Sequence, residues 1–239
     1  MLNILVPIAG PNIEINNYPK PLVEIYDKSL IELVTKNVDI AEPHQFTFVV
    51  NREDYDKFYL GSMLRIMEPT SNVVIAEGDT AGALCSALLA VDYIDNDDPL
   101  LIISGDQYLR SSYNDFYAYF STNKVDGGIV TFHALHPKWS YVKLDEAGNV
   151  VEVAEKRVIS NLATAGIFYF KTGRLFVECA QGTIKKGKAL NGKYYISEVY
   201  NELILKNMKI VSYTINHKDL FKLNTPEQIA KFQELNIVG

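Results

Sequence analysis

The sequence predicts an α/β protein of three layers, in which helices cover both faces of a mixed, mostly parallel central sheet. Strand-like and helix-like segments alternate through the first half of the chain, which is typical of a parallel sheet with crossover helices. A continuous apolar run begins at Leu100 between turn residues, as in a strand buried on both faces. With 239 residues, 48% of them hydrophobic, the chain is long enough to bury a substantial core.

In the first half, β-branched and aromatic residues predict strands, and apolar residues at helical spacing predict helices between them. The first helix is expected to begin after Ser29, whose side chain suits the N-cap position. We expect strands at residues 4–9, 45–51, 72–76 and from 100, and helices at 29–40, 54–67 and 84–94.

In the second half, the alternation of apolar and polar residues around the turn at 146–149 predicts a hairpin over residues 139–153. The last helix is expected to begin at Thr225, with Pro226 at its first position. Further strands are predicted at 127–133, 163–170 and 209–215, and helices at 112–120, 172–180 and 196–205. Because no repeat or linker-like stretch interrupts the pattern, residues 1–239 are expected to form a single domain.

The composition limits the classes of partner. The 23 Lys and Arg residues against 29 Asp and Glu give a net charge of −6, which argues against nucleic acid and anionic membranes as partners. The apolar segment at residues 4–9 is too short for a membrane span or a signal-peptide core, so a cytoplasmic protein is expected. Cys85 and Cys179 lack metal-type spacing and are expected to be reduced thiols.

Polar residues follow three of the predicted strands, where ligands gather in open parallel sheets. Asp106 follows the buried strand and suits a metal ion or a hydroxyl group, or alternatively caps the next helix. The loop containing Gly78 and Gly82 offers backbone N–H groups to a nucleotide, or simply packs closely on the helix. Pro residues on both sides of Lys20 restrict its backbone, which favours a fixed lysine.

The order of these motifs resembles the sugar-phosphate nucleotidyltransferases, or pyrophosphorylases. The resemblance covers residue 4 to about residue 232, with 194–204 and 223–227 similar to small capsule-type and lipopolysaccharide-type members. It implies a Rossmann-like nucleotidyltransferase fold, with a nucleotide-binding half at 1–110 and an acceptor-binding half at 111–239. The motifs that carry it are Pro19-Lys20-Pro21-Leu22, the loop at 77–83, Gly105-Asp106, Glu155-Lys156 and the strand around Gly166.

The resemblance also implies an activity and its residues. Such an enzyme condenses a nucleoside triphosphate, here CTP or GTP by analogy, with a phosphorylated sugar or related phosphate ester, releasing pyrophosphate for capsule polysaccharide synthesis. Mg²⁺ would be held by Asp106 and Asn224, and the catalytic residues would be Lys20, Asp106 and Lys156. The nucleotide would contact Ala9, Gly10, Glu77, Thr80, Gly82 and Gly105, and the acceptor would contact Glu155, Lys156 and Gly166.

One loop departs from the family pattern. Residues 10–14 read Gly-Pro-Asn-Ile-Glu where family members usually have Gly-x-Gly-Ser/Thr-Arg, so the arginine is missing. Arg52 or Lys28 could supply the cation; alternatively, the chain is an inactive or regulatory homologue that binds nucleotide or sugar phosphate. A glycosyltransferase is disfavoured because Asp-x-Asp is absent after the buried strand, and a dinucleotide-binding oxidoreductase because Gly-x-Gly-x-x-Gly is absent. The aromatic second half could form a homodimer contact.

Overall fold

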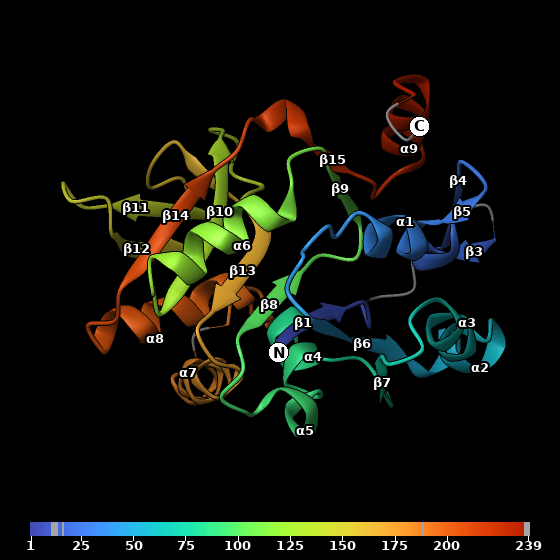
Figure 1. The fold of residues 1–239 in the computed structure, drawn as a ribbon, viewed down its shortest axis with the longest axis horizontal. Coiled ribbons are helices and arrows are strands. Elements are labelled where there is room, and N and C mark those ends of the chain that lie inside the picture. Colours follow the sequence, from blue (N-terminus) through green and yellow to red (C-terminus); the bar gives the residue numbers. More distant parts are fainter. Residues whose placement is uncertain (11–13, 16, 188, 237–239) are drawn as a thin grey trace.

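The computed structural model describes residues 1–10, 14–15, 17–187 and 189–236. Within these ranges nine strands form the main sheet: β1 (Leu2–Pro7), β6 (His44–Asn51), β7 (Asn72–Ala76), β8 (Leu100–Ile103), β10 (Gly127–His133), β11 (Tyr141–Leu144), β12 (Val150–Ala154), β13 (Leu162–Phe170) and β14 (Ile210–Thr214). Their order is β12-β11-β13-β8-β1-β6-β7, with β10 paired to β13 and β14 paired to β10 (Figure 1).

The sheet has a parallel side and an antiparallel side. Strands β8, β1, β6 and β7 run parallel to one another, while β13 runs antiparallel to β8, β10 and β11. On the antiparallel side, β14 pairs parallel to β10 at the edge of the sheet. The parallel side comes from the first half of the chain, where strands and helices alternate. The prediction of a mixed central sheet is confirmed.

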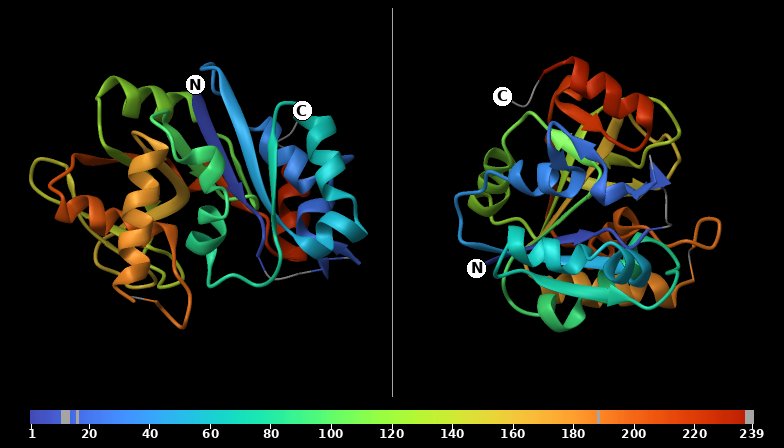
Figure 2. Two further views of the ribbon diagram at one scale, coloured as in Figure 1. Left: turned by 90° about the horizontal axis from the view of Figure 1, so that it is seen from below. Right: turned by 90° about the vertical axis from the view of Figure 1, so that its right-hand side faces the viewer.

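Helices lie on both faces of the sheet (Figure 2). They are α1 (Leu30–Lys36), α2 (Arg52–Lys57), α3 (Leu60–Met67), α4 (Ala83–Leu88), α5 (Val91–Ile94), α6 (Tyr113–Thr122), α7 (Gly173–Lys185), α8 (Val199–Leu205) and α9 (Pro226–Glu234). Alternate residues of β1 point to opposite faces, so Ile4 packs in the core with α1 and α6, and Leu5 in the core with α4 and α7. The three-layer prediction is therefore confirmed. None of the helices in the described ranges is long and apolar enough to cross a membrane.

Two predicted helices are interrupted. The helix expected at 54–67 is two helices, α2 and α3, because Tyr59 adopts a left-handed backbone conformation with a φ of 55°. Leu60 and Leu64 after the break pack into the same core, so the apolar periodicity continues across it. The helix expected at 84–94 is likewise divided into α4 and α5.

Short elements complete the described chain. Two strand pairs lie near the N-terminus, β2 (Glu14–Ile15) with β3 (Tyr18–Pro19), and β4 (Glu24–Ile25) with β5 (Lys28–Ser29). The 3₁₀ helices are η1 (Lys20–Leu22), η2 (Ile196–Glu198) and η3 (His217–Asp219). A third pair, β9 (Gln107–Leu109) with β15 (Leu220–Lys222), was not predicted from the sequence.

The pairing of β9 with β15 returns the C-terminal segment to the first half of the molecule. Leu223 N donates to Asp106 O at 2.9 Å, so Asn224 follows immediately beside the end of β8. Helix α9 then packs on the N-terminal half, where the hydroxyl of Tyr26 contacts the carbonyl oxygens of Phe232 at 2.9 Å and Gln233 at 2.7 Å. Figure 1 shows α9 next to β15, on the side of the molecule that carries α1.

Candidate active site

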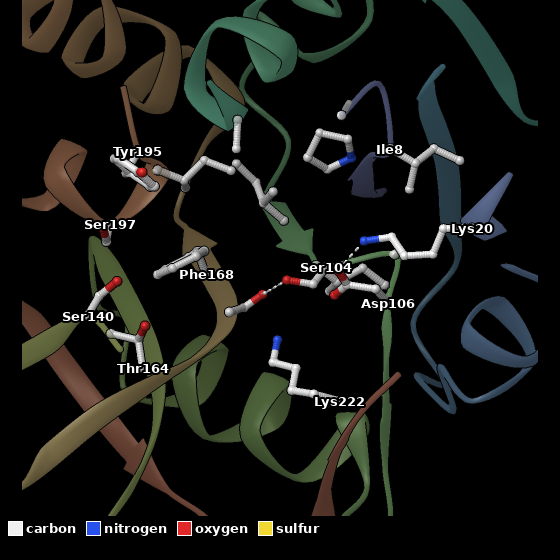
Figure 3. Close-up of a pocket in the computed structure, with 18 of the residues that line it drawn as sticks. Ile8, Lys20, Ser104, Asp106, Ser140, Thr164, Phe168, Tyr195, Ser197 and Lys222 are labelled. Carbon is white, nitrogen blue, oxygen red and sulfur yellow. Dashed lines mark hydrogen bonds and ion pairs between the residues drawn. The ribbon is translucent and has the colours of Figure 1, made fainter. Parts of the chain in front are cut away.

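A cavity of about 370 Å³ opens beyond the carboxyl ends of β1 and β8, where the sequence predicted a ligand site. Its walls come from both sides of the sheet (Figure 3). The parallel side contributes Pro7, Ile8, Gly10, Lys20 and residues 102–106, and the antiparallel side contributes Trp139, Ser140, Glu155, Thr164, Gly166, Phe168 and residues 195–197. The cavity therefore lies between the predicted nucleotide and acceptor halves.

Three polar side chains from distant parts of the chain meet beside this cavity, and two of them, Lys20 and Asp106, line it. The Nζ of Lys20 donates to Oδ2 of Asp106 at 2.8 Å and to Oδ1 of Asn224 at 3.1 Å. Lys20 begins η1, and the Pro residues on either side of it restrict its backbone as expected. The structure thus brings together the predicted lysine and the two predicted metal ligands.

The oxygens of Asp106 and Asn224 fit Mg²⁺. Both oxygens accept a hydrogen bond from the Nζ of Lys20, so the two oxygens are close enough together to contact one cation. Mg²⁺ prefers oxygen ligands and is usually held by one or two protein groups together with water and substrate phosphates. Among the described residues, no group of three or more His, Cys, Asp or Glu side chains is placed to hold a metal ion.

A second lysine, Lys222, lines the cavity from β15, and its Nζ donates to Oε1 of Gln107 at 2.5 Å. Partial burial alone would raise the pKa of Asp106, but the ammonium groups of Lys222 and Lys20 lower it overall, so this carboxyl stays ionised. Burial lowers the pKa of Lys222, an effect that the charge of Asp106 partly opposes.

The antiparallel side of the cavity is lined with hydroxyl groups around one carboxylate. Oε2 of Glu155 accepts hydrogen bonds from Ser140 and, at 2.9 Å, from Ser197. The backbone N–H of Glu155 donates to Oε1 of Glu198 at 2.8 Å, which fixes the start of the loop after β12. The wall offers the donors and acceptors that a hydroxyl-bearing ligand requires.

Gly166 is required by the backbone of β13. Its φ is +77°, and a Cβ there would lie 2.7 Å from Oγ of Ser104. The same position faces Lys222, whose Nζ would be 3.4 Å from that Cβ. The absence of a side chain at residue 166 therefore leaves room between β8, β13 and β15.

Several predicted site residues lie behind or beside the cavity. Gly82 has a φ of +103° and packs on the backbone of Tyr194, where a Cβ would lie 2.5 Å from the carbonyl oxygen, so close packing is one reason for this glycine. Thr80 bonds to Ser86 at 2.6 Å and accordingly supports the loop. Ala9, Glu77, Thr80, Gly82, Lys156 and Asn224 are not among the residues that line the cavity, whereas Gly10, Lys20, Gly105, Asp106, Glu155 and Gly166 are.

Lys156 lies next to the cavity wall and is exposed. Its Nζ donates to the hydroxyl of Tyr195 at 3.1 Å, and this hydrogen bond raises the pKa of Lys156. Tyr195 itself lines the cavity. The amine of Lys156 is therefore one hydrogen bond away from a residue that lines the cavity.

A comparison with protein families identifies the group to which the chain belongs. Residues 16–219 match the family model described as nucleotidyl transferase. This chain belongs to the nucleotidyl transferase family. The family resemblance expected from the sequence motifs is confirmed, and with it the assignment as an enzyme of nucleotidyl transfer. None of the curated proteins matches the chain.

Solved structures share the fold of this nucleotidyl transferase. A nucleoside-diphosphate-sugar pyrophosphorylase from Vibrio cholerae RC9 has a TM-score of 0.81 at 21% identity, covering 97% of this chain and 99% of that one. A UDP-glucose pyrophosphorylase complexed with UDP-glucose has a TM-score of 0.76 at 18% identity, covering 98% and 97%. A putative glucose-1-phosphate thymidylyltransferase from Bacillus anthracis, in complex with a sucrose, has a TM-score of 0.73 at 18% identity, covering 100% and 95%.

Sequence reasoning missed part of this nucleotidyl transferase site. Lys222 was not predicted, because a single lysine in a three-residue strand carries no pattern. The two cations considered as replacements for the missing arginine do not line the cavity: Arg52 pairs with Glu77 and Asp56, and Lys28 lines a second cavity. The altered loop itself falls partly on residues 11–13, outside the described residues.

Proposed function

We propose that this protein is a cytoplasmic, Mg²⁺-dependent enzyme that transfers a nucleotidyl group from CTP or GTP to a phosphorylated sugar or related small phosphate ester. The other product is pyrophosphate, and the activated sugar would serve capsule polysaccharide synthesis. The nucleoside triphosphate would lie along the ends of β1 and β8, and the acceptor against β11 and β13. The family to which the chain belongs supports this class of reaction.

The observation that carries the proposal is the convergence of Lys20, Asp106 and Asn224 on the parallel side of the cavity. Nucleotidyl transfer needs charge neutralisation and positioning more than it needs a protein nucleophile. A lysine and two metal-type oxygen ligands, fixed at the ends of η1, β8 and β15, supply both. The chemistry therefore suits a triphosphate whose negative charge must be balanced.

In the proposed reaction, an oxygen of the acceptor phosphate attacks the α-phosphorus of the triphosphate. A new P–O bond forms as the bond from the α-phosphorus to its bridging oxygen breaks, and pyrophosphate leaves with that electron pair. Mg²⁺ bound at Asp106 and Asn224 would supply Lewis-acid neutralisation of the phosphate charge. Lys20 would orient the phosphates with its Nζ, and the residues that line the cavity would hold the two substrates in position to react.

The body of the acceptor is proposed to lie against the antiparallel side. Glu155 and the hydroxyl groups of Ser140, Thr164 and Ser197 would hydrogen-bond its hydroxyl groups. Lys156, beside Tyr195, would contribute a further positive charge next to the acceptor.

The test is an assay of pyrophosphate release. The protein is incubated with Mg²⁺, each of the four nucleoside triphosphates in turn, and a panel of sugar 1-phosphates and phospho-alcohols. Pyrophosphate release with one pair of substrates, and its absence in the Asp106→Asn variant, would support the proposed enzymatic activity. No release across the panel, with retained nucleotide binding, would instead support the inactive binding homologue that the altered loop at 10–14 allows.

A further inference from the structure

Lys222 is a cation that the family motifs do not explain. Its Nζ has one neutral hydrogen-bond partner, the amide oxygen of Gln107, and among the described residues its side chain forms no ion pair. Partly burying an ammonium group without a bonded counter-ion costs free energy, which an anion bound in the cavity would offset.

The position of Lys222 separates it from Lys20. The Nζ of Lys222 lies against Gly166 of β13, on the side of the cavity that faces the acceptor wall. The Nζ of Lys20 contacts Asp106 and Asn224. Figure 3 shows the two amines directed into the cavity from different elements, with Phe168 and the hydroxyl groups of Ser140, Thr164 and Ser197 on the side opposite Lys20. An anion bound to Lys222 would thus lie between two parts of the cavity. On one side are Lys20 and Asp106, and on the other are the hydroxyl groups around Glu155.

We propose that Lys222 binds the phosphate group of the acceptor, and that Lys20 is thereby left to the phosphates of the nucleoside triphosphate. The inference rests on the proposed function, and it deepens that function by assigning the acceptor phosphate to a residue of β15. The ligand class is a phosphate monoester whose phosphate lies at Gly166 and whose hydroxyl-bearing body extends toward Glu155. Lys222 positions the attacking oxygen beside the metal ligands of the reaction.

The hydrogen bond between Lys222 and Gln107 offers a substitution that changes the charge next to Lys222 without changing the packing around it. Gln107 is fully buried, and Gln107→Glu would place a carboxylate on the Nζ of Lys222 with almost no change of shape. Such an internal counter-ion would compete with a bound phosphate. Because this substitution also adds a negative charge to the site, its result is interpreted together with that of Lys222→Met, which adds none.

The experiment is calorimetric titration of inorganic phosphate into the protein without nucleotide or metal. The variants are Lys222→Met and Gln107→Glu, with Lys218→Met as the matched control, since Lys218 is exposed four residues earlier and does not line the cavity. We expect both test variants to weaken phosphate binding about tenfold or more, the loss of one hydrogen bond to a charged group, and the control to bind as the wild type does. Lys222→Gln replaces Lys222→Met if the latter fails to fold.

Unchanged phosphate affinity in Lys222→Met, or no saturable binding by the wild type, would overturn the inference. Its failure is distinguishable from that of the proposed function, because phosphate binding is measured without turnover. Where pyrophosphate release is detected, Lys222→Met should raise the KM for the acceptor about tenfold while leaving the KM for the triphosphate close to its original value. A rise confined to the triphosphate KM would also overturn the inference.

Discussion

The parallel and antiparallel sides of the sheet contribute different chemistry to one cavity. On the parallel side, strand ends and η1 position charged groups, with Lys20 bonded to Asp106 and Asn224. On the antiparallel side, Ser140 before β11 and Ser197 of η2 donate their hydroxyl groups to the carboxylate of Glu155. Under the proposed function, charge balance and acceptor recognition are built on separate parts of the fold, so substitutions on the two sides should affect different kinetic constants.

The largest expected effect is on the charged side. Asp106→Asn removes the carboxylate between the two lysines, and turnover should fall on the order of hundredfold to thousandfold because several kcal/mol of metal-assisted stabilisation is lost. Pyrophosphate release and calorimetric titration of Mg²⁺ measure the two consequences, with circular dichroism as the control for folding. Undiminished turnover would remove Asp106 from the site.

On the acceptor side, Glu155→Gln should raise the KM for the acceptor about tenfold, since a charged hydrogen-bond acceptor becomes a neutral one. The KM for the triphosphate should change little. Initial rates at varied concentrations of each substrate measure both constants. If the triphosphate KM changed instead, the division between the two sides of the cavity would be wrong.

A smaller effect is expected at the rim. Lys156→Ala should raise the acceptor KM about threefold to fivefold, because an exposed charge beside Tyr195 contributes less than 1 kcal/mol in water. Lys156→Arg, which keeps the charge, is the control and should restore most of the affinity. An unchanged KM for the acceptor in Lys156→Ala would count against a role in binding.

The smallest effect concerns helix α9, which follows β15 and packs on the N-terminal half of the molecule. Tyr26→Phe removes the hydroxyl that contacts the carbonyl oxygens of Phe232 and Gln233, and so weakens the attachment of α9. The free energy of unfolding, measured in urea, should fall by about 1 kcal/mol. The hydroxyl has one proton and so donates one hydrogen bond, and the loss of one such bond costs about that much. A loss of activity far larger than this change in stability would show that α9 also positions Asn224.

Much of the architecture was predictable because its determinants are local. The apolar run at β8 predicted a buried strand followed by Asp106, and the alternation before it predicted the parallel side. Helix breaks were not predictable: Leu60 and Leu64 continue the apolar spacing beyond the left-handed Tyr59, so the pattern of burial concealed the change of backbone.

By itself, the sequence determined the family, the layered fold and the presence of an aspartate, an asparagine and lysines suited to phosphate chemistry. Only the tertiary structure decided which of these groups meet. Residues 107–109 and 220–222 are too short to show a strand pattern, yet their pairing brings Asn224 to Lys20 and Lys222 to Gly166. The physical reason is that pairing across more than a hundred residues depends on the packing of the whole sheet and of α9, which no local sequence pattern encodes.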